Sequence, residues 1–361
     1  MRPIPTRAPR LALTALALTL CSLSACDSNG DEASCEVFQT CDAQQALNVS
    51  LIESKTRLPA NVSILFKVDA MDDAPVAGLL PANFDVFENE KLISQFESQR
   101  NILPKVGQFK YSIVLLLDLS GSIVASENLE ALKKAATSFV DAVMFAPDDP
   151  RYGEIEMGIW WFDGQADVTS LVGVTIDPEA LSAGVESITP ELMKDNSTNL
   201  YGAVIQGIDL TEQRLDAIVR RNVISAGSVV LFTDGADQAN RESRSDALEA
   251  VRRSGDEVSV YTIGLGGEID EETLTEIGRE GFVSAPRIEE LLPKFQEIAD
   301  LVRDEANSYY LLEYCSPKRE GDHTLTIRVT TEAEVGLLST RFSAENFTGG
   351  CAVSKGAVPT N

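Results

Sequence analysis

Histidine is almost missing from this chain, which has 361 residues and a single histidine, His323. Because that residue lies in a terminal strand-like segment, a Ser–His–Asp triad is implausible, and no H-E-x-x-H pattern is present for a zinc protease. His323 follows an acid in a predicted turn, so we expect a solvated loop residue. The sequence therefore argues against both of these hydrolase classes.

Basic residues are also scarce: the chain has 30 Lys and Arg but 56 Asp and Glu, which gives a net charge of −26. Such a chain repels nucleic acid and anionic lipid head groups, and no Lys/Arg patch offsets the repulsion. With 44% apolar and 24% charged residues, the composition is that of a folded chain of one large or two modest domains. We expect a solvated acidic surface and no nucleic-acid partner.

The apolar stretch near the amino end, residues 11–20, is too short to span a bilayer comfortably. Three arginines precede it and a run of small residues follows it, which is the layout of a secretory signal. We expect residues 1–25 to be removed on export. Their loss takes away three positive charges and no acid, so the net charge changes from −26 to −29.

Residues 23–26, Leu-Ser-Ala-Cys, resemble a bacterial lipobox. The resemblance implies cleavage before Cys26, lipid on its thiol and an acylated amino terminus, with residues 26–47 as a polar tether. The alternative is an ordinary signal peptide followed by a chance cysteine. We expect a protein of the bacterial cell envelope, anchored by lipid to a membrane and facing the periplasm or the outside.

Four cysteines remain after export and lipidation: Cys35, Cys41, Cys315 and Cys351. An even number of thiols in an oxidising compartment favours disulfides, and three pairings are possible. A zinc site is the rival interpretation, but the paired C-x-x-C spacing that it usually needs is absent. The simplest pairing joins Cys35 to Cys41 and Cys315 to Cys351.

The pattern along the chain divides it into a centre and two flanks. Residues 106–306 alternate apolar strands with helix-length amphipathic segments, which predicts an α/β fold with a doubly wound, mostly parallel sheet. Residues 48–105 and 307–352 are strand-like and individually too short for a persuasive core, so we expect them to pack together as one small β-sandwich. Residues 353–361 are expected to be a tail.

Polar oxygen ligands follow two of the central strands. Asp118, Ser120 and Ser122 come after the apolar run 111–117, and Asp234 follows the strand-like run 228–233. In open α/β sheets ligands bind at the carboxyl ends of the strands, so these groups meet if the two strands are neighbours. Oxygen ligands of this kind suit Mg²⁺ or Mn²⁺, with Ca²⁺ possible.

The run Asp118-Leu119-Ser120-Gly121-Ser122 resembles the D-x-S-x-S motif of the von Willebrand factor A family, in which it forms part of a metal-ion-dependent adhesion site. The family also uses a distant Thr and a distant Asp, which match Thr198 and Asp234; the adjacent Ser197 is an alternative hydroxyl. The flanks resemble a bacterial group of these proteins. The resemblance implies a Rossmann-like domain that binds, without catalysis, a protein partner whose carboxylate completes the coordination of the metal.

Two other functions are weighed against this interpretation. One is a structural scaffold lipoprotein whose metal site is unused, because a fold does not fix a function. The other is a Mg²⁺-dependent phosphatase of the haloacid dehalogenase type with Asp118 as nucleophile, but these enzymes need a second Asp where this chain has Ser120. We therefore predict that the protein is not an enzyme and has no small-molecule substrate.

Overall fold

A computed structural model describes residues 47–72, 74–93, 100–103, 109–124, 128–221, 223–332 and 334–351. The predicted signal peptide, Cys26, most of the predicted tether, Cys35, Cys41 and the predicted tail lie outside these residues. Among the described helices none is long and apolar enough to cross a membrane. The described residues belong to one compact unit.

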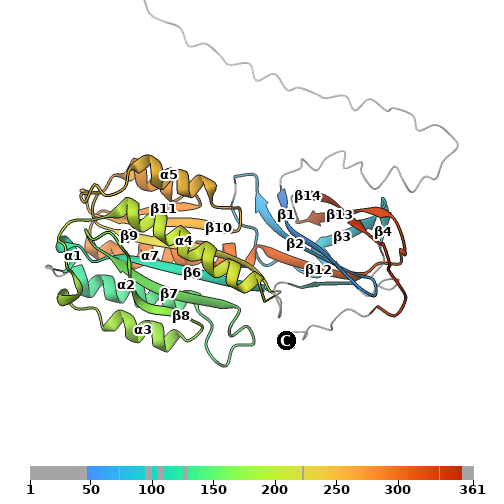
Figure 1. Cartoon of the computed structure of the whole chain (residues 1–361), viewed down its shortest axis with the longest axis horizontal. Coiled ribbons are helices and arrows are strands. Elements are labelled where there is room, and N and C mark those ends of the chain that lie inside the picture. The colour runs from blue at the N-terminus through green and yellow to red at the C-terminus, as the bar shows by residue number, and fades with distance from the viewer. Residues whose placement is uncertain are drawn as a thin grey trace, which may run out of the picture. The chain divides into compact units, whose positions relative to one another are not determined.

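The centre of this unit is a six-stranded sheet in the order β11-β10-β9-β6-β7-β8 (Figure 1). Its strands are β6 (Phe109–Asp118), β7 (Ile155–Phe162), β8 (Thr169–Thr175), β9 (Ile224–Thr233), β10 (Val258–Leu265) and β11 (Gly281–Ala285). All neighbours are parallel except β7 and β8, which are antiparallel. Strands β6 and β9 are direct neighbours, as the placement of Asp118 and Asp234 requires.

Helices cover both faces of this sheet. They are α1 (Gly121–Val124), α2 (Asn128–Val143), α3 (Pro178–Glu186), α4 (Leu200–Val219), α5 (Arg244–Arg253), α6 (Glu271–Ile277) and α7 (Leu291–Asn307), with short 3-10 turns at Pro81–Asn83, Pro190–Leu192 and Ile288–Glu290. Ile113, Leu115 and Leu117 of β6 join the core under α2, α3 and α7, whereas Val114 and Leu116 join the core under α4, α5 and α6. Since side chains alternate along a strand, a doubly covered strand must be apolar throughout. The doubly wound sheet is confirmed.

The flanks form two four-stranded antiparallel sheets that share one core (Figure 1). The first contains β1 (Leu47–Arg57), β2 (Asn61–Ala70), β12 (Tyr309–Cys315) and β5 (Arg100–Leu103), and the second contains β14 (Val335–Ser343), β13 (Asp322–Thr330), β3 (Phe84–Glu88) and β4 (Lys91–Leu92). Between the sheets, the ring of Phe84 lies 5.7 Å from that of Phe66 and 5.0 Å from that of Tyr310. Each sheet draws strands from both flanks, which confirms the predicted sandwich.

The sandwich contacts the central sheet at the amino ends of the central strands. Phe109, the first residue of β6, stacks on Tyr309, the first residue of β12, with ring centroids 5.3 Å apart. The N–H of Val68 in β2 donates to the carbonyl of Ser308 directly after α7 (3.1 Å). Asp118 ends β6 nine residues later, which places it about 30 Å from this junction at the usual rise of a strand.

A buried ionic network holds the junction together. The carboxylate of Glu305, near the end of α7, is 1% exposed and accepts hydrogen bonds from Ser259 (2.9 Å) and Tyr309 (3.1 Å). The ammonium of Lys67 in β2 lies 2.9 Å from Glu305 and 3.1 Å from Asp69. Burial alone lowers the pKa of Lys67, but the charges of Glu305 and Asp69 outweigh it and raise the pKa.

Two edge strands were not predicted from the sequence. Strand β8 is half exposed along its length, and β11 has only five residues. Edge strands of this kind lack the continuous apolar run that marks a buried strand.

The expectation that His323 is a solvated loop residue is wrong. His323 belongs to β13 and is half-buried. Its ring nitrogens lie 2.9 Å from the side-chain amide nitrogen of Asn89 and 2.8 Å from the carbonyl of Glu320.

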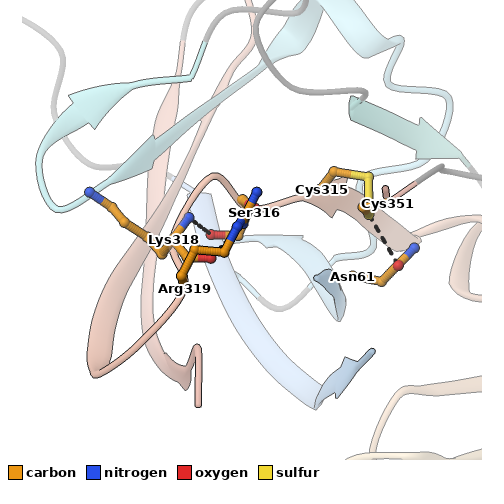
Figure 2. The surroundings of a disulfide bond; sticks show 6 residues. All are labelled: Asn61, Cys315, Ser316, Lys318, Arg319 and Cys351. Atoms are coloured by element: carbon orange, nitrogen blue, oxygen red, sulfur yellow. Dashed lines mark hydrogen bonds between the residues drawn. A yellow bond between two sulfur atoms is a disulfide. The ribbon is translucent and has the colours of Figure 1, made fainter. Parts of the chain in front are cut away.

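A disulfide joins Cys315, the last residue of β12, to Cys351 beyond β14. Figure 2 shows the bridge beside the side chain of Asn61, whose Oδ1 lies 3.1 Å from the sulfur of Cys351. The bond ties the carboxyl-terminal arm to the strand that follows α7. One of the predicted pairs is thus confirmed, and the pairing of Cys35 with Cys41 falls outside the described residues.

Removal of this disulfide is expected to lower the free energy of unfolding by about 2–4 kcal/mol, because the bridge closes a long loop and restricts the unfolded chain. Urea unfolding of a Cys315→Ser/Cys351→Ser variant under non-reducing conditions measures the loss while leaving the other cysteines unchanged. A change below about 0.5 kcal/mol, the size of an ordinary surface substitution, would contradict the expectation.

Candidate metal centre

Asp118 occupies the carboxyl end of β6 and is completely buried. Its Oδ1 accepts the N–H of Ser120 (2.9 Å), and its Oδ2 accepts the hydroxyl of Thr233, the last residue of β9 (2.6 Å). The carboxylate is therefore held in one orientation by the loop that follows β6 and by the end of the neighbouring strand β9.

Two hydroxyls follow Asp118: Ser120 lies in the loop before α1, and Ser122 lies in the first turn of α1. The hydroxyl of Ser122 donates to Oδ1 of Asp234 (2.9 Å), and the hydroxyl oxygens of Ser120 and Ser122 are 3.4 Å apart. Ser120 is 1% exposed, whereas Ser122 is exposed. The structure thus brings together the four groups predicted from the ends of β6 and β9.

Thr198 reaches the same place from the loop before α4. It is 2% exposed, and its carbonyl accepts the N–H groups of Gln238 and Ala239 at 2.9 and 3.0 Å. Its hydroxyl would be 3.7 Å from a Cβ atom built on Gly235, so it lies against the loop that carries Asp234.

Ser197, the alternative hydroxyl, has a different partner. It donates to Oδ1 of Asp195 (2.8 Å), and that carboxylate also accepts the N–H of Ser197 (3.0 Å). The geometry therefore favours Thr198 as the hydroxyl of the site.

The loop that carries Thr198 is fastened by an acid that sequence reasoning did not identify. Asp163, 2% exposed, follows β7 and accepts the N–H groups of Gln165 (2.8 Å), Lys194 (2.7 Å) and Asp195 (2.9 Å). A second fastening joins the loops directly, since the N–H of Gly121 donates to the carbonyl of Asn196 (3.1 Å). An acid directly after a third parallel strand was the available signal for Asp163.

Burial dominates the electrostatics of the two carboxylates. With a smaller contribution from the charge of Asp234, it raises the pKa of Asp118 from 3.8 to about 7, although the hydrogen bonds from Thr233 and Ser120 act in the opposite direction. Burial also raises the pKa of Asp234, and the charge of Glu268 adds to that rise. A cation placed between the two carboxylates would relieve both effects.

The donor set fits a hard divalent cation. It consists of two carboxylates and three hydroxyls, and oxygen-only sets of this kind suit Mg²⁺, Mn²⁺ or Ca²⁺. Within the described ranges no group of three or more His, Cys, Asp or Glu residues forms a metal-binding cluster.

The sequence pattern of the von Willebrand factor type A (VWA) domain matches residues 112–299, just over half of the chain. The chain belongs to the VWA domain family. VWA domains are typically interaction modules, and the matched range spans the central sheet from β6 to most of α7. No sequence among the curated proteins matches the chain.

Several solved structures are similar to parts of this chain. Proximal thread matrix protein 1 from the mussel byssus is 18% identical, with 60% of this chain and 50% of the mussel chain covered and a TM-score of 0.42. A von Willebrand factor type A protein from Catenulispora acidiphila is 10% identical over 85% of this chain and 75% of that chain, with a TM-score of 0.45. The manganese-loaded TRAP protein of Plasmodium vivax is 16% identical over 70% and 99%, with a TM-score of 0.43.

Two of these proteins hold metals. The mussel protein has a structure with zinc in its MIDAS motif, the metal-ion-dependent adhesion site, and the Plasmodium protein was solved with manganese. The present chain spans about half the length of the mussel protein.

Proposed function

We propose that the VWA domain binds a divalent cation through Asp118, Ser120, Ser122, Thr198 and Asp234, and that the cation recruits a carboxylate of a partner protein without catalysis. The observation that carries this proposal is the convergence of three hydroxyls and two carboxylates at one edge of the sheet. Mg²⁺ is the first candidate, with Mn²⁺ and Ca²⁺ as alternatives.

The five residues would contribute two kinds of oxygen ligand to the cation. Ser120, Ser122 and Thr198 supply neutral oxygens, while Asp118 and Asp234 supply negative charge that is already oriented by hydrogen bonds. A cation bound largely by neutral oxygens keeps its attraction for an anionic oxygen from outside. Because Ser122 is exposed while Asp118, Ser120 and Thr198 are buried, the partner's carboxylate would approach from the side of Ser122.

The cation also accounts for how so acidic a protein can bind an acidic group. At a net charge of −26 the surface repels carboxylates at long range. A divalent ion is the largest local charge in such a site and reverses the sign of the field there. Removal of the metal should therefore abolish binding of the partner.

A lipid on Cys26 would hold this binding site at a membrane of the cell envelope. The support comes from the signal layout of residues 1–25 and from the lipobox resemblance. The proposed tether enters the fold at β1, in the sandwich, and the metal centre lies at the edge of the VWA sheet away from the junction with the sandwich. The lipid and the partner would then attach to different parts of the fold.

A structural scaffold with an unused metal site is the second candidate. Its support is the hydrogen bond from Ser122 to Asp234, which satisfies both groups without a cation. Calorimetric titration separates the two candidates.

Titration of the purified protein with Mg²⁺, Mn²⁺ and Ca²⁺ is expected to show one saturable site. Asp118→Ala should abolish it, and Thr198→Val should weaken it by at least about tenfold, since even residues that only orient metal ligands contribute that much. Ser197→Ala is the matched control because its hydroxyl is directed to Asp195, and its affinity should stay within about twofold of the wild type.

Two results would count against the proposal. Equal losses in Thr198→Val and Ser197→Ala would mean that the assigned hydroxyl is wrong. If no cation binds the free protein, the direct coordination proposed here is wrong and the scaffold is favoured.

A further inference from the structure

The turn after β7 contacts all three loops that carry the proposed ligands, although it supplies no ligand itself. We refer to Phe162, Asp163 and Gly164 as the β7 turn. The carbonyl of Phe162 accepts the N–H of Leu119, which lies between two of the proposed ligands (2.8 Å). The carbonyl of Gly164 accepts a hydrogen bond from the side chain of Arg241 in the loop after β9 (2.6 Å). The β7 turn is therefore placed to set the spacing of these loops.

Asp163 holds the third loop on both sides of Thr198. Its Oδ2 accepts the N–H groups of Lys194 (2.7 Å) and Asp195 (2.9 Å), which precede Thr198. Its main-chain carbonyl accepts the N–H of Asn199, which directly follows Thr198 (2.9 Å). Because Asp163 is only 2% exposed, water has little access to compete for these bonds. The position of Thr198 thus depends on one buried residue.

Gly164 allows the same two loops to approach each other closely. A Cβ atom built on Gly164 would overlap the hydroxyl oxygen of Ser197 and the carboxylate of Asp195. The side-chain amide of Asn199 also donates to the carbonyl of Gln165 (2.8 Å). The loop of Thr198 is therefore packed against the β7 turn as well as hydrogen-bonded to it.

We propose that Asp163 is a positioning residue of the metal centre, which fixes the hydroxyl of Thr198 for a small cation and so makes the site prefer Mg²⁺ to Ca²⁺. This inference rests on the proposed cation-mediated function and adds the residue that sets which ion is bound. Asp163 touches neither the cation nor the partner, and it acts through the loop of Thr198.

The two cations differ in how much movement of a ligand they tolerate. Mg²⁺ demands near-ideal octahedral geometry with ligands at about 2.0–2.1 Å, whereas Ca²⁺ accepts flexible geometry at about 2.3–2.6 Å. A hydroxyl that is no longer held in place should therefore cost Mg²⁺ more affinity than Ca²⁺. Loss of a nearby negative charge would instead weaken both divalent ions alike. The ratio of the two affinities separates positioning from charge.

Calorimetric titration of Asp163→Ala with each cation tests the proposal. The wild type should bind Mg²⁺ more tightly than Ca²⁺. The dissociation constant of the variant for Mg²⁺ should rise by about ten- to hundredfold, the usual effect of losing a group that orients a metal ligand, and that for Ca²⁺ by about threefold or less.

Asp163→Asn is the conservative variant, and it carries the test if Asp163→Ala does not fold. One oxygen remains to accept the N–H groups of Lys194 and Asp195, while the new amide faces the N–H of Gln165, which the second carboxylate oxygen accepts in the wild type (2.8 Å). Affinity for Mg²⁺ should therefore fall by only about three- to tenfold, with affinity for Ca²⁺ unchanged within about twofold.

Two further measurements distinguish positioning from a general loss of stability. In a Thr198→Val background, either substitution of Asp163 should lower Mg²⁺ affinity by no more than about threefold, because the ligand that Asp163 positions is already gone. In a chelator, the main-chain amides of Lys194 and Asp195 should exchange with deuterium faster in Asp163→Ala than in the wild type.

Asp177→Ala is the matched control. Asp177 also accepts two main-chain N–H groups, as the N-cap of α3. It follows β8, whose last residue pairs with Met157 near the start of β7, whereas Asp163 follows the end of β7. The control should lose stability, but its dissociation constants for Mg²⁺ and Ca²⁺ should both stay within about twofold of the wild type.

The results separate this inference from the proposed function. Equal losses of Mg²⁺ and Ca²⁺ affinity, unchanged affinities, a wild type that prefers Ca²⁺, or an undiminished effect in the Thr198→Val background would overturn the role of Asp163 and leave cation binding intact. A wild type that binds neither cation would overturn both.

Discussion

The metal-free protein is expected to become more stable when Asp118 is replaced by asparagine at pH 8. The folded-state pKa of Asp118 is about 7 and its ordinary value is 3.8. The folded protein therefore binds this proton more tightly than the unfolded chain, and the stabilisation that results is complete below about pH 4 and lost as the pH rises through about 7. Each pKa unit corresponds to about 1.4 kcal/mol, so the ionised group costs on the order of 4 kcal/mol at pH 8.

Asparagine removes this cost but weakens the hydrogen bonds from Ser120 and Thr233. Subtracting about 1–2 kcal/mol for that loss leaves an expected gain of about 2–3 kcal/mol at pH 8. At pH 5 the wild-type carboxyl is already largely protonated, so the gain should disappear. Urea unfolding in the presence of a chelator at both pH values measures the difference.

Addition of Mg²⁺ should make the wild type more stable than the Asp118→Asn variant. A ligand at one thousand times its dissociation constant stabilises the folded state by about 4.1 kcal/mol, which exceeds the gain expected for the variant, and only the wild type is expected to bind it. Asp216→Asn removes an exposed charge from α4 and serves as the control, with a small change that does not depend on pH. An Asp118→Asn variant that is less stable than the wild type at pH 8 without metal would contradict the prediction.

Lys67→Met is expected to be the most damaging single substitution at the junction between the sandwich and the VWA domain. It leaves the buried carboxylates of Glu305 and Asp69 without the cation that lies 2.9 and 3.1 Å from them. Removing one partner of a buried ionic group typically costs about 3–5 kcal/mol, because the remaining charge is not compensated. Urea unfolding at pH 7 provides the measurement.

The two carboxylates make the network asymmetric, which gives a matched comparison. Glu305→Gln leaves Lys67 with Asp69 as a neutral pair, and the amide oxygen can still accept hydrogen bonds from Ser259 and Tyr309. Its loss should therefore be clearly smaller than that of Lys67→Met. The double variant Lys67→Met/Glu305→Gln should recover part of the loss of Lys67→Met, since one uncompensated charge is removed. Equal effects of the two single variants would show that the network does not act through charge.

Local sequence patterns predicted most of the central architecture. The unbroken apolar run of β6 indicates a strand covered on both faces, and its alternate residues do enter the two separate cores. The spacing of leucine, alanine and phenylalanine in α2 likewise predicted the buried face of that helix. Such patterns can be recognised in the sequence because the burial of each strand or helix requires apolar residues at its own buried positions.

The edge strands were not predicted because fewer of their residues are buried, so fewer of their positions must be apolar. Among the described strands, β8 has one neighbour, β7, and its residues are largely half-exposed or exposed. Its sequence is therefore free of the apolar run that identifies β6, and only pairing with β7 makes it a strand. The same holds for β11 at the other edge, which pairs only with β10.

The candidate metal centre shows the same division. The sequence by itself determined the types of the candidate ligands and their position after β6 and β9, because a change from apolar to oxygen-bearing residues at a strand end is a local signal. It also determined the charge, the signal layout and the four thiols left to pair. Only the tertiary structure decided between Ser197 and Thr198, paired Cys315 with Cys351, and revealed Asp163. These features depend on contacts between residues that are far apart in the sequence, such as the hydrogen bond between Thr233 and Asp118, which are 115 residues apart. They also depend on the burial that such contacts produce.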